Sequence, residues 1–277
     1  MVENEINIVM KKTDGSVKKR KLVIHFNNVG SPFMNLYLYM NDTLDRTELI
    51  KFEDYEIVDG IPVNINKVVD IIHEFVFKVD QINLLISSDD TFKITTSLPK
   101  ISKGRAMKIY RNDMKNENGD NKTKYYSNFE LYKHLLGFIF YTYFIPMDIV
   151  TFFRKVASLL KTKLTKVDLF SHFIFNNVKN TIEEDFIYYY EENGLATFIL
   201  SYGKTFTSYA TFINDEANIN LKYVSILAKH AFELERKEIN VIYTNNKEKV
   251  LHLGECKDHK ISLKAYEFKG IELWKRD

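Results

Sequence analysis

The sequence predicts an α/β fold in which mixed sheets are flanked by helices. Residues 185–214 carry the first observation, because they read as three consecutive strands of β-branched and aromatic residues. The segments 191–194 and 201–204 contain Asn-Gly and Gly, which are typical of the turns between such strands. The second observation is that apolar residues recur at helical spacing before and after these strands, at 64–76 and at 220–237.

The composition indicates a densely folded chain in a reducing compartment. The 277 residues include 21 Phe and 17 Tyr but only 10 Gly and 4 Pro, which argues against disorder. A net charge of +2 gives no electrostatic case for nucleic acid as a partner. The single cysteine, Cys256, excludes an intramolecular disulfide framework. The apolar run 135–147 is too short to span a bilayer and the N-terminus lacks an apolar signal core, so we expect a cytoplasmic protein.

The first sixty residues are predicted to be mostly extended. Segments 4–10 and 17–26 flank Asp14-Gly15, a pair that indicates a hairpin turn. The segments Phe33–Met40 and 49–58 follow as further extended stretches. The run 17–21 carries four adjacent positive charges, which we interpret as the solvated start of a strand. The alternative is a contact with anionic lipid or an acidic partner.

The middle of the chain alternates between helices and strands. Asn64 or Asn66 can cap the helix that begins at 64. Strands are expected at 81–87 and 91–98, paired with each other, then a helix to Tyr110 and a polar surface loop at 111–128. The later predicted elements are aromatic strands in 129–144, a helix opened by Pro146, a strand at 163–170 and a short helix at 171–179. After the three strands of 185–214 follow the helix at 220–237 and strands at 239–243, 249–253 and 261–268. No linker divides the chain, so we expect one unit, 1–277, with interwoven parts near 1–165 and 166–277.

Three passages carry a family resemblance. They are the strand–strand–Leu-Pro-Lys–helix passage at 86–115, the helix-to-strand passage at 145–176 that includes a strand ending at an Asp, and the three strands at 185–214. In this order they resemble the actin-like ATPase superfamily, which has a ribonuclease H-like fold. The closer similarity is to the PilM proteins of type IV pilus assembly and to the cytoplasmic domain of GspL proteins of type II secretion. The resemblance covers about two thirds of the chain through pattern rather than identity.

The resemblance implies a nucleotide site made of turns. In the family, two hairpin turns hold the phosphates of ATP and its Mg²⁺, and a later glycine-rich turn admits the adenosine. The first turn corresponds here to Asp14 and Gly15. The second corresponds to Ser201, Gly203, Thr205 and Thr207, with Ser201 in the place of the family's Asp, and the adenosine turn corresponds to 244–247, which has no glycine. These departures indicate vestigial phosphate turns, no catalytic residues and no required cofactor.

The implied function is therefore that of a non-catalytic scaffold. In the resembled family the partner is a membrane-anchored PilN-type protein, held through a short cytoplasmic peptide at the inner face of the cytoplasmic membrane, and a homo-oligomer is compatible with this role. A strand edge or a groove between subdomains can hold such a peptide. The alternative is an active ATPase or a sugar-kinase-like phosphotransferase that binds ATP and Mg²⁺ through Asp14 and the 201–207 turn.

A metal site is a second alternative. His252, Cys256 and His259 have a spacing that fits Zn²⁺, with a nearby carboxylate as the fourth ligand. We favour a polar turn between two late strands, because such a spacing also arises by coincidence.

Overall fold

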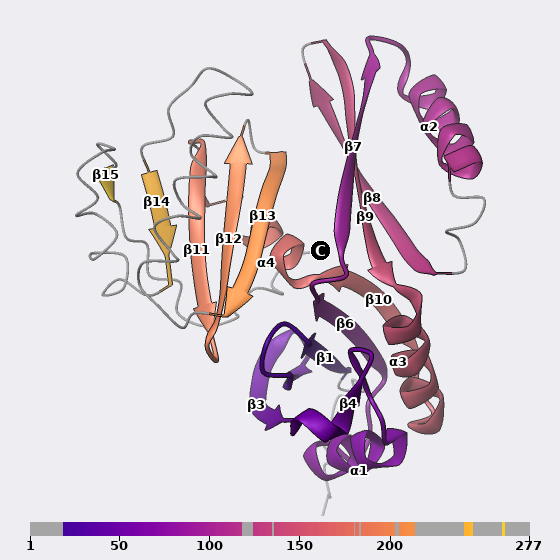
Figure 1. Ribbon diagram of the computed structural model, residues 1–277, viewed down its shortest axis with the longest axis vertical. Coiled ribbons are helices and arrows are strands. Elements are labelled where there is room, and N and C mark those ends of the chain that lie inside the picture. The colour runs from indigo at the N-terminus through magenta and orange to yellow at the C-terminus, as the bar shows by residue number, and fades with distance from the viewer. Residues whose placement is uncertain are drawn as a thin grey trace, which may run out of the picture.

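The computed structural model has three sheets and a small hairpin (Figure 1). It describes residues 19–117, 124–134, 136–179, 181–182, 184–202, 205–213, 241–245 and 262–263. None of the described helices is long and apolar enough to span a bilayer.

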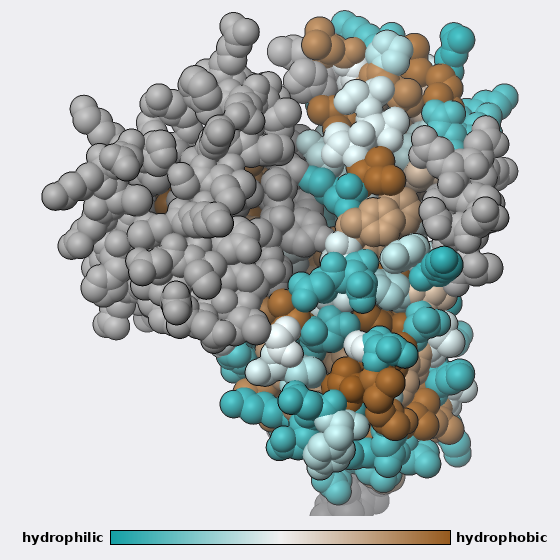
Figure 2. Space-filling model, viewed as in Figure 1, coloured by the Kyte–Doolittle hydropathy of each residue, from teal (hydrophilic) through white to brown (hydrophobic). Residues whose placement is uncertain are grey.

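The first sheet has five strands in the order β10-β6-β1-β2-β3. Their bounds are β1 Arg20–Asn27, β2 Phe33–Met40, β3 Thr43–Lys51, β6 Gln81–Ser87 and β10 Leu164–Leu169. The first three strands are antiparallel neighbours, whereas β6 and β10 run parallel to β1. Parallel strands need covered faces, and both β1 and β6 are accordingly buried along most of their length. Hydrophilic residues predominate at the lower end of this part of the molecule (Figure 2).

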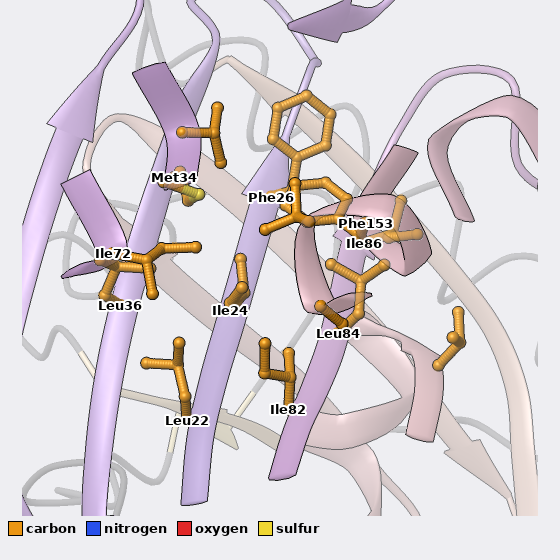
Figure 3. Packing of buried hydrophobic residues seen from close by; sticks show 14 of the residues in the cluster. Leu22, Ile24, Phe26, Met34, Leu36, Ile72, Ile82, Leu84, Ile86 and Phe153 are labelled. Atoms are coloured by element: carbon orange, nitrogen blue, oxygen red, sulfur yellow. The ribbon is translucent and has the colours of Figure 1, made fainter. Parts of the chain in front are cut away.

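Two helices cover one face of the first sheet. We call the first sheet together with these two helices the first lobe. They are α1, Ile65–Phe75, and α3, Met147–Leu159. Asn64 caps α1 by accepting a hydrogen bond from the Lys67 amide, as the sequence predicts. Pro146 opens α3 from the N-cap position, just before the first turn in which the sequence placed it. Alternate residues of β1 and β6 pack against Ile72 and Phe153 of these helices (Figure 3).

A smaller sheet in the order β7-β9-β8 extends from the first lobe. Its strands are β7 Phe92–Pro99, β8 Tyr125–His134 and β9 Gly137–Pro146, and α2, Lys103–Glu117, packs on it through Ala106 and Tyr110. The prediction that 91–98 pairs with 81–87 is wrong, because both edges of β6 are taken by β1 and β10. The loop prediction for 111–128 is wrong at both ends, where α2 and β8 extend into it.

The second lobe is the five-stranded sheet β13-β12-β11-β14-β15. Its strands are β11 Phe186–Glu192, β12 Leu195–Tyr202, β13 Thr205–Ile213, β14 Val241–Thr244 and β15 Ser262–Leu263. The predicted three-strand arrangement is confirmed by the antiparallel pairing of β11, β12 and β13. The parallel pairing of β14 with β11 and of β15 with β14 repeats the topology of the first sheet.

The remaining described elements are short. They are the 3-10 helix η1, Asp54–Glu56, and the hairpin of β4, Ile57–Val58, and β5, Ile61–Pro62. The predicted extended stretch 49–58 is therefore interrupted after β3 ends at Lys51. Helix α4, Phe170–Val178, leads from the first lobe to the second.

Candidate functional site

Helix α4 fills the space between the two lobes. Its buried apolar residues share one cluster with Val23 and Leu85 of the first sheet and with Tyr188 and Ile199 of the second. Every residue from Phe170 to Phe175 is buried, because the helix has a sheet on either side. The lobes are therefore joined through a continuous apolar core, and any site between them lies at the margin of α4.

The first hairpin turns of the two five-stranded sheets meet each other at this margin. Val29 and Phe33, which belong to the turn region between β1 and β2, pack against Leu195 at the start of β12. Asn193 and Gly194 form the two-residue turn before Leu195 and have φ angles of 53° and 78°. An Asn-Gly pair adopts these positive angles readily, so the sequence specifies this turn locally. The three apolar side chains occupy the contact between the turns.

A partly buried polar contact crosses the lobes beside these turns. The Tyr37 hydroxyl donates to Glu192 Oε1 at 2.9 Å, which links β2 to the end of β11. His25 is fully buried, stacks on Phe170 at 3.6 Å, and has Nε2 3.0 Å from the Ser87 hydroxyl. Burial lowers the pKa of His25 to about 3, so its imidazole is neutral. Burial also raises the pKa of the Glu192 carboxyl, although hydrogen bonds from Tyr37 and Tyr190 oppose the shift.

A cavity of about 430 Å³ opens between the lobes next to this contact. Its walls come from β2 and β3 of the first lobe, from α4, and from β11 with Asn245 of the second lobe. The Asn245 side chain accepts from the Glu191 amide and donates to the Glu191 carbonyl, at 2.9 and 2.8 Å, which holds it against β11. The described polar lining consists of Asn35, Tyr37, Thr47, Glu48, Tyr188, Tyr190, Glu191, Glu192, Asn193 and Asn245. It thus contains three carboxylates and no basic side chain.

A second polar cluster ties the smaller sheet to the first lobe. His172 of α4 lies between two carboxylates, with Nδ1 2.8 Å from Asp168 and Nε2 2.7 Å from Glu130 of β8. Burial opposes the charge on His172, but the two carboxylates outweigh it and raise the pKa of the imidazole to about 9. Burial opposes the charge on both carboxylates, but the protonated imidazole outweighs it and holds the pKa of Glu130 at about 2. It also lowers the pKa of the fully buried Asp168, to which Lys166 at 3.2 Å contributes. His172 is therefore a buried cation that joins β8, β10 and α4. We call Asp168, His172 and Glu130 the His172 cluster.

The His172 cluster predicts how stability depends on pH. The imidazole has an ordinary pKa of 6.5 and about 9 when folded, so its contribution is complete below pH 6.5 and is lost as the pH rises through about 9. Glu130 contributes above its ordinary pKa of 4.5, and that contribution is lost as the pH falls through about 2. We therefore expect the contribution of the His172 cluster to the free energy of unfolding in urea to be greatest between about pH 4.5 and 6.5 and to fall by about 3 kcal/mol towards pH 9, whereas buried His25 lowers stability as the pH falls below 6.5. A His172→Gln variant should lose the alkaline part of this dependence, and an unchanged alkaline slope in that variant would contradict the assignment.

The structure describes only part of the residues assigned from the sequence. Asp14, Gly15, Gly203, His252, Cys256 and His259 lie outside the described residues. Ser201 is fully buried near the end of β12, and its hydroxyl has no hydrogen-bond partner among the described residues. Thr205 and Thr207 are residues of strand β13. Among the described ranges, no three His, Cys, Asp or Glu side chains are grouped so that they could hold a metal ion.

Asn245, from the predicted adenosine turn at 244–247, lines the cavity between the lobes, whereas the other described residues that meet there were not assigned from the sequence. The turn at Asn193-Gly194 faces the first lobe, whereas Ser201 lies at the opposite end of β12, which points away from that lobe in Figure 1. Glu192 and His25 received no assignment from the sequence, because their contact joins positions 167 residues apart. The sequence does mark this meeting point through Asn193-Gly194, because an Asn-Gly pair between two predicted strands indicates a hairpin turn.

Comparison with known proteins identifies the fold. No family model and no curated protein matches this chain. A PilM-PilN type IV pilus biogenesis complex is similar in structure, with a TM-score of 0.59 and 10% identity over 88% of each chain. The cytoplasmic domain of EpsL, an inner-membrane component of the type II secretion system of Vibrio cholerae, gives 0.57 and 6% over 90% of this chain and 91% of that one. A Bacteroides thetaiotaomicron protein with an actin-like ATPase fold and unknown function gives 0.54 and 10% over 92% and 94%. The chain therefore has the actin-like ATPase fold.

Proposed function

We propose that this chain is a non-catalytic actin-like scaffold in an assembly machine of the type IV pilus or type II secretion kind. In this role it holds a cytoplasmic segment of a membrane-anchored, PilN-type partner and works in the cytoplasm at the inner face of the membrane. The setting is supported by two of the structural neighbours, one a PilM-PilN complex and the other the cytoplasmic domain of an inner-membrane secretion component.

The charge of the cavity between the lobes carries this proposal. Glu48, Glu191 and Glu192 line it, and no lysine, arginine or histidine is among its described lining residues. A nucleoside triphosphate brings several negative charges, which need cations and backbone N–H groups and are repelled by nearby carboxylates. A basic peptide side chain finds complementary charge in the same place, and the rings of Tyr188 and Tyr190 add a favourable surface for a cation.

Two further contacts support a holding role rather than hydrolysis. The apolar side chains of Val29, Phe33 and Leu195 bring the first turns of the two sheets into direct contact. Asp168, at the end of β10, is fully buried and bound to His172, so its carboxylate is already engaged within the chain. In both contacts, side chains near the boundary between the lobes hold parts of the fold together.

Calorimetric titration with Mg·ATP tests the non-catalytic part of the proposal. We expect no heat of binding at millimolar nucleotide, because the described cavity offers carboxylates where phosphate needs cations. Micromolar binding would overturn this part and favour the alternative of an active ATPase or phosphotransferase.

Charge reversal at Glu48 tests the holding role. Glu48 is an exposed residue of β3 on the rim of the cavity, so Glu48→Lys should leave the fold intact. We expect the variant to bind a basic cytoplasmic segment about tenfold more weakly, because a rim charge then repels it. The measurement is affinity capture of the tagged protein from solubilised membranes, followed by calorimetry with a synthetic peptide of the recovered protein's cytoplasmic segment. Glu74→Lys, on the exposed side of α1, is the matched control, and equal binding by all three proteins would exclude the cavity.

A further inference from the structure

The lower end of the first lobe gathers several chain segments at one edge. The strands β1, β6 and β10 are parallel, so all three begin at the same edge of the sheet. Helices α1 and α3 precede β6 and β10 and therefore end at this edge, as the course of α3 shows in Figure 1. The segments concerned are residue 19, the hairpin turn 41–42, the loop 76–80 and the loop 160–163.

Backbone hydrogen bonds fix these segments side by side. The Arg20 amide donates to the Asp80 carboxylate at 2.7 Å, and the Asp80 amide donates to the Arg20 carbonyl at 3.0 Å. The Ile82 amide donates to the Lys163 carbonyl at 2.9 Å, and the Asn41 amide donates to the Lys19 carbonyl at 3.0 Å. The edge is therefore a built surface rather than a set of independent loops.

Positive charge dominates this edge. Lys19, Lys78, Lys161 and Lys163 are exposed, and none of them forms an ion pair within the part of the chain that the structure describes. The four segments carry two carboxylates, of which that of Asp42 pairs with Lys21 at 2.8 Å and that of Asp80 accepts from the Arg20 amide. The four lysines thus face solvent with little local compensation.

Two large apolar side chains stand out among these lysines. Phe77 is 89% exposed, although its neighbours Val76 and Val79 are buried in the core and hold the loop in place. Leu159, the last residue of α3, is 51% exposed. Exposed aromatic and aliphatic side chains beside lysines are typical of surfaces that enter the boundary between lipid headgroups and acyl chains.

We propose that this edge, which we call the cationic edge, is the surface by which the protein lies on an anionic lipid bilayer. The lysines contact the headgroups and Phe77 and Leu159 enter the interface between them. The inference deepens the proposed function, on which it rests for the membrane-peripheral location, by naming the face that meets the membrane. Lipid is favoured over an acidic protein because charge complementarity alone does not account for the exposed Phe77.

Co-sedimentation of the full-length protein with vesicles tests the proposal. Vesicles of mixed phosphatidylglycerol and phosphatidylcholine should bind the protein, and vesicles of phosphatidylcholine alone should not. Each lysine near an anionic surface changes the partition coefficient about fivefold, so Lys78→Glu with Lys163→Glu should weaken binding by about 25-fold or more. Lys103→Glu with Lys108→Glu makes the same charge change on the exposed side of α2 and should have no effect. Phe77→Ser should weaken binding several-fold and leave the salt dependence unchanged.

Two other sets of outcomes would overturn the proposal. Absence of binding to anionic vesicles, or equal loss with the α2 control pair, would show that the cationic edge is not a membrane surface. Binding to poly-glutamate with the same lysine dependence, combined with no effect of Phe77→Ser on vesicles, would identify an acidic protein as the occupant instead. Because the vesicles contain no protein, their result is independent of the capture experiment, so a failure of either proposal is recognised separately.

Discussion

Replacing His172 by alanine is expected to lower the free energy of unfolding by about 3–5 kcal/mol, among the largest single effects in this protein. The reason is that the variant leaves Asp168, which is 1% exposed, and Glu130 of β8 without the cation that lies between them. Urea unfolding near pH 6, where the cluster is fully formed, measures the effect. His73→Ala, an exposed histidine on α1, is the control and should change stability by less than about 0.5 kcal/mol.

A second substitution separates charge from packing in this result. Adding Asp168→Asn to His172→Ala removes the buried carboxylate that the single variant leaves with Lys166, 3.2 Å away, as its cationic partner. We expect the double variant to recover part of the lost stability, since a neutral amide costs less to bury than a carboxylate that has lost one of its two cationic partners. A double variant that is less stable than the single one would show that the cluster acts through shape rather than through charge.

Replacing Phe153 by alanine is expected to cost about 3–5 kcal/mol for a different reason. Phe153 is 1% exposed and lies 5.4 Å, ring to ring, from Phe26 of the central strand β1 (Figure 3). The substitution leaves a cavity between α3 and the first sheet that the rigid strands cannot collapse to fill. Thermal or urea unfolding measures the loss.

The neighbouring phenylalanine provides a matched control. Phe152 belongs to the same helix, but it is only partly buried at the margin of the core. Phe152→Ala should therefore cost clearly less than Phe153→Ala. Equal losses for the two variants would contradict the assignment of Phe153 to the centre of the core.

The repeated topology of the two lobes explains why candidate sites lie between them. Each five-stranded sheet begins with three antiparallel strands and continues with two parallel strands, so each presents its first hairpin turn towards the other lobe. In this protein that meeting point holds apolar side chains and a Tyr37–Glu192 hydrogen bond. The arrangement supports the proposed scaffold role, because the acidic walls of the cavity beside it come from both lobes, which are packed against each other.

The elements with strong local signals were predictable from the sequence. The three strands β11, β12 and β13 follow from alternating β-branched and aromatic residues and from Asn-Gly between the first two. The helix α1 follows from the Asn64 cap and an apolar stripe, and α3 follows from Pro146. The polar composition of 111–128 was misleading, because solvent-facing residues of a surface helix and of an edge strand are also polar.

The sequence by itself determined the α/β class and the elements with strong local signals, such as α1, α3 and the strands β11 to β13, since these depend on residues within a few positions of one another. Only the tertiary structure decided that β6 lies between β1 and β10, and that Glu130 meets His172 across 42 positions of the chain. It also placed Glu192 beside His25, and it gathered the four lysines and Phe77 at one edge. Such contacts depend on which faces the whole core buries together, and no local spacing records that choice.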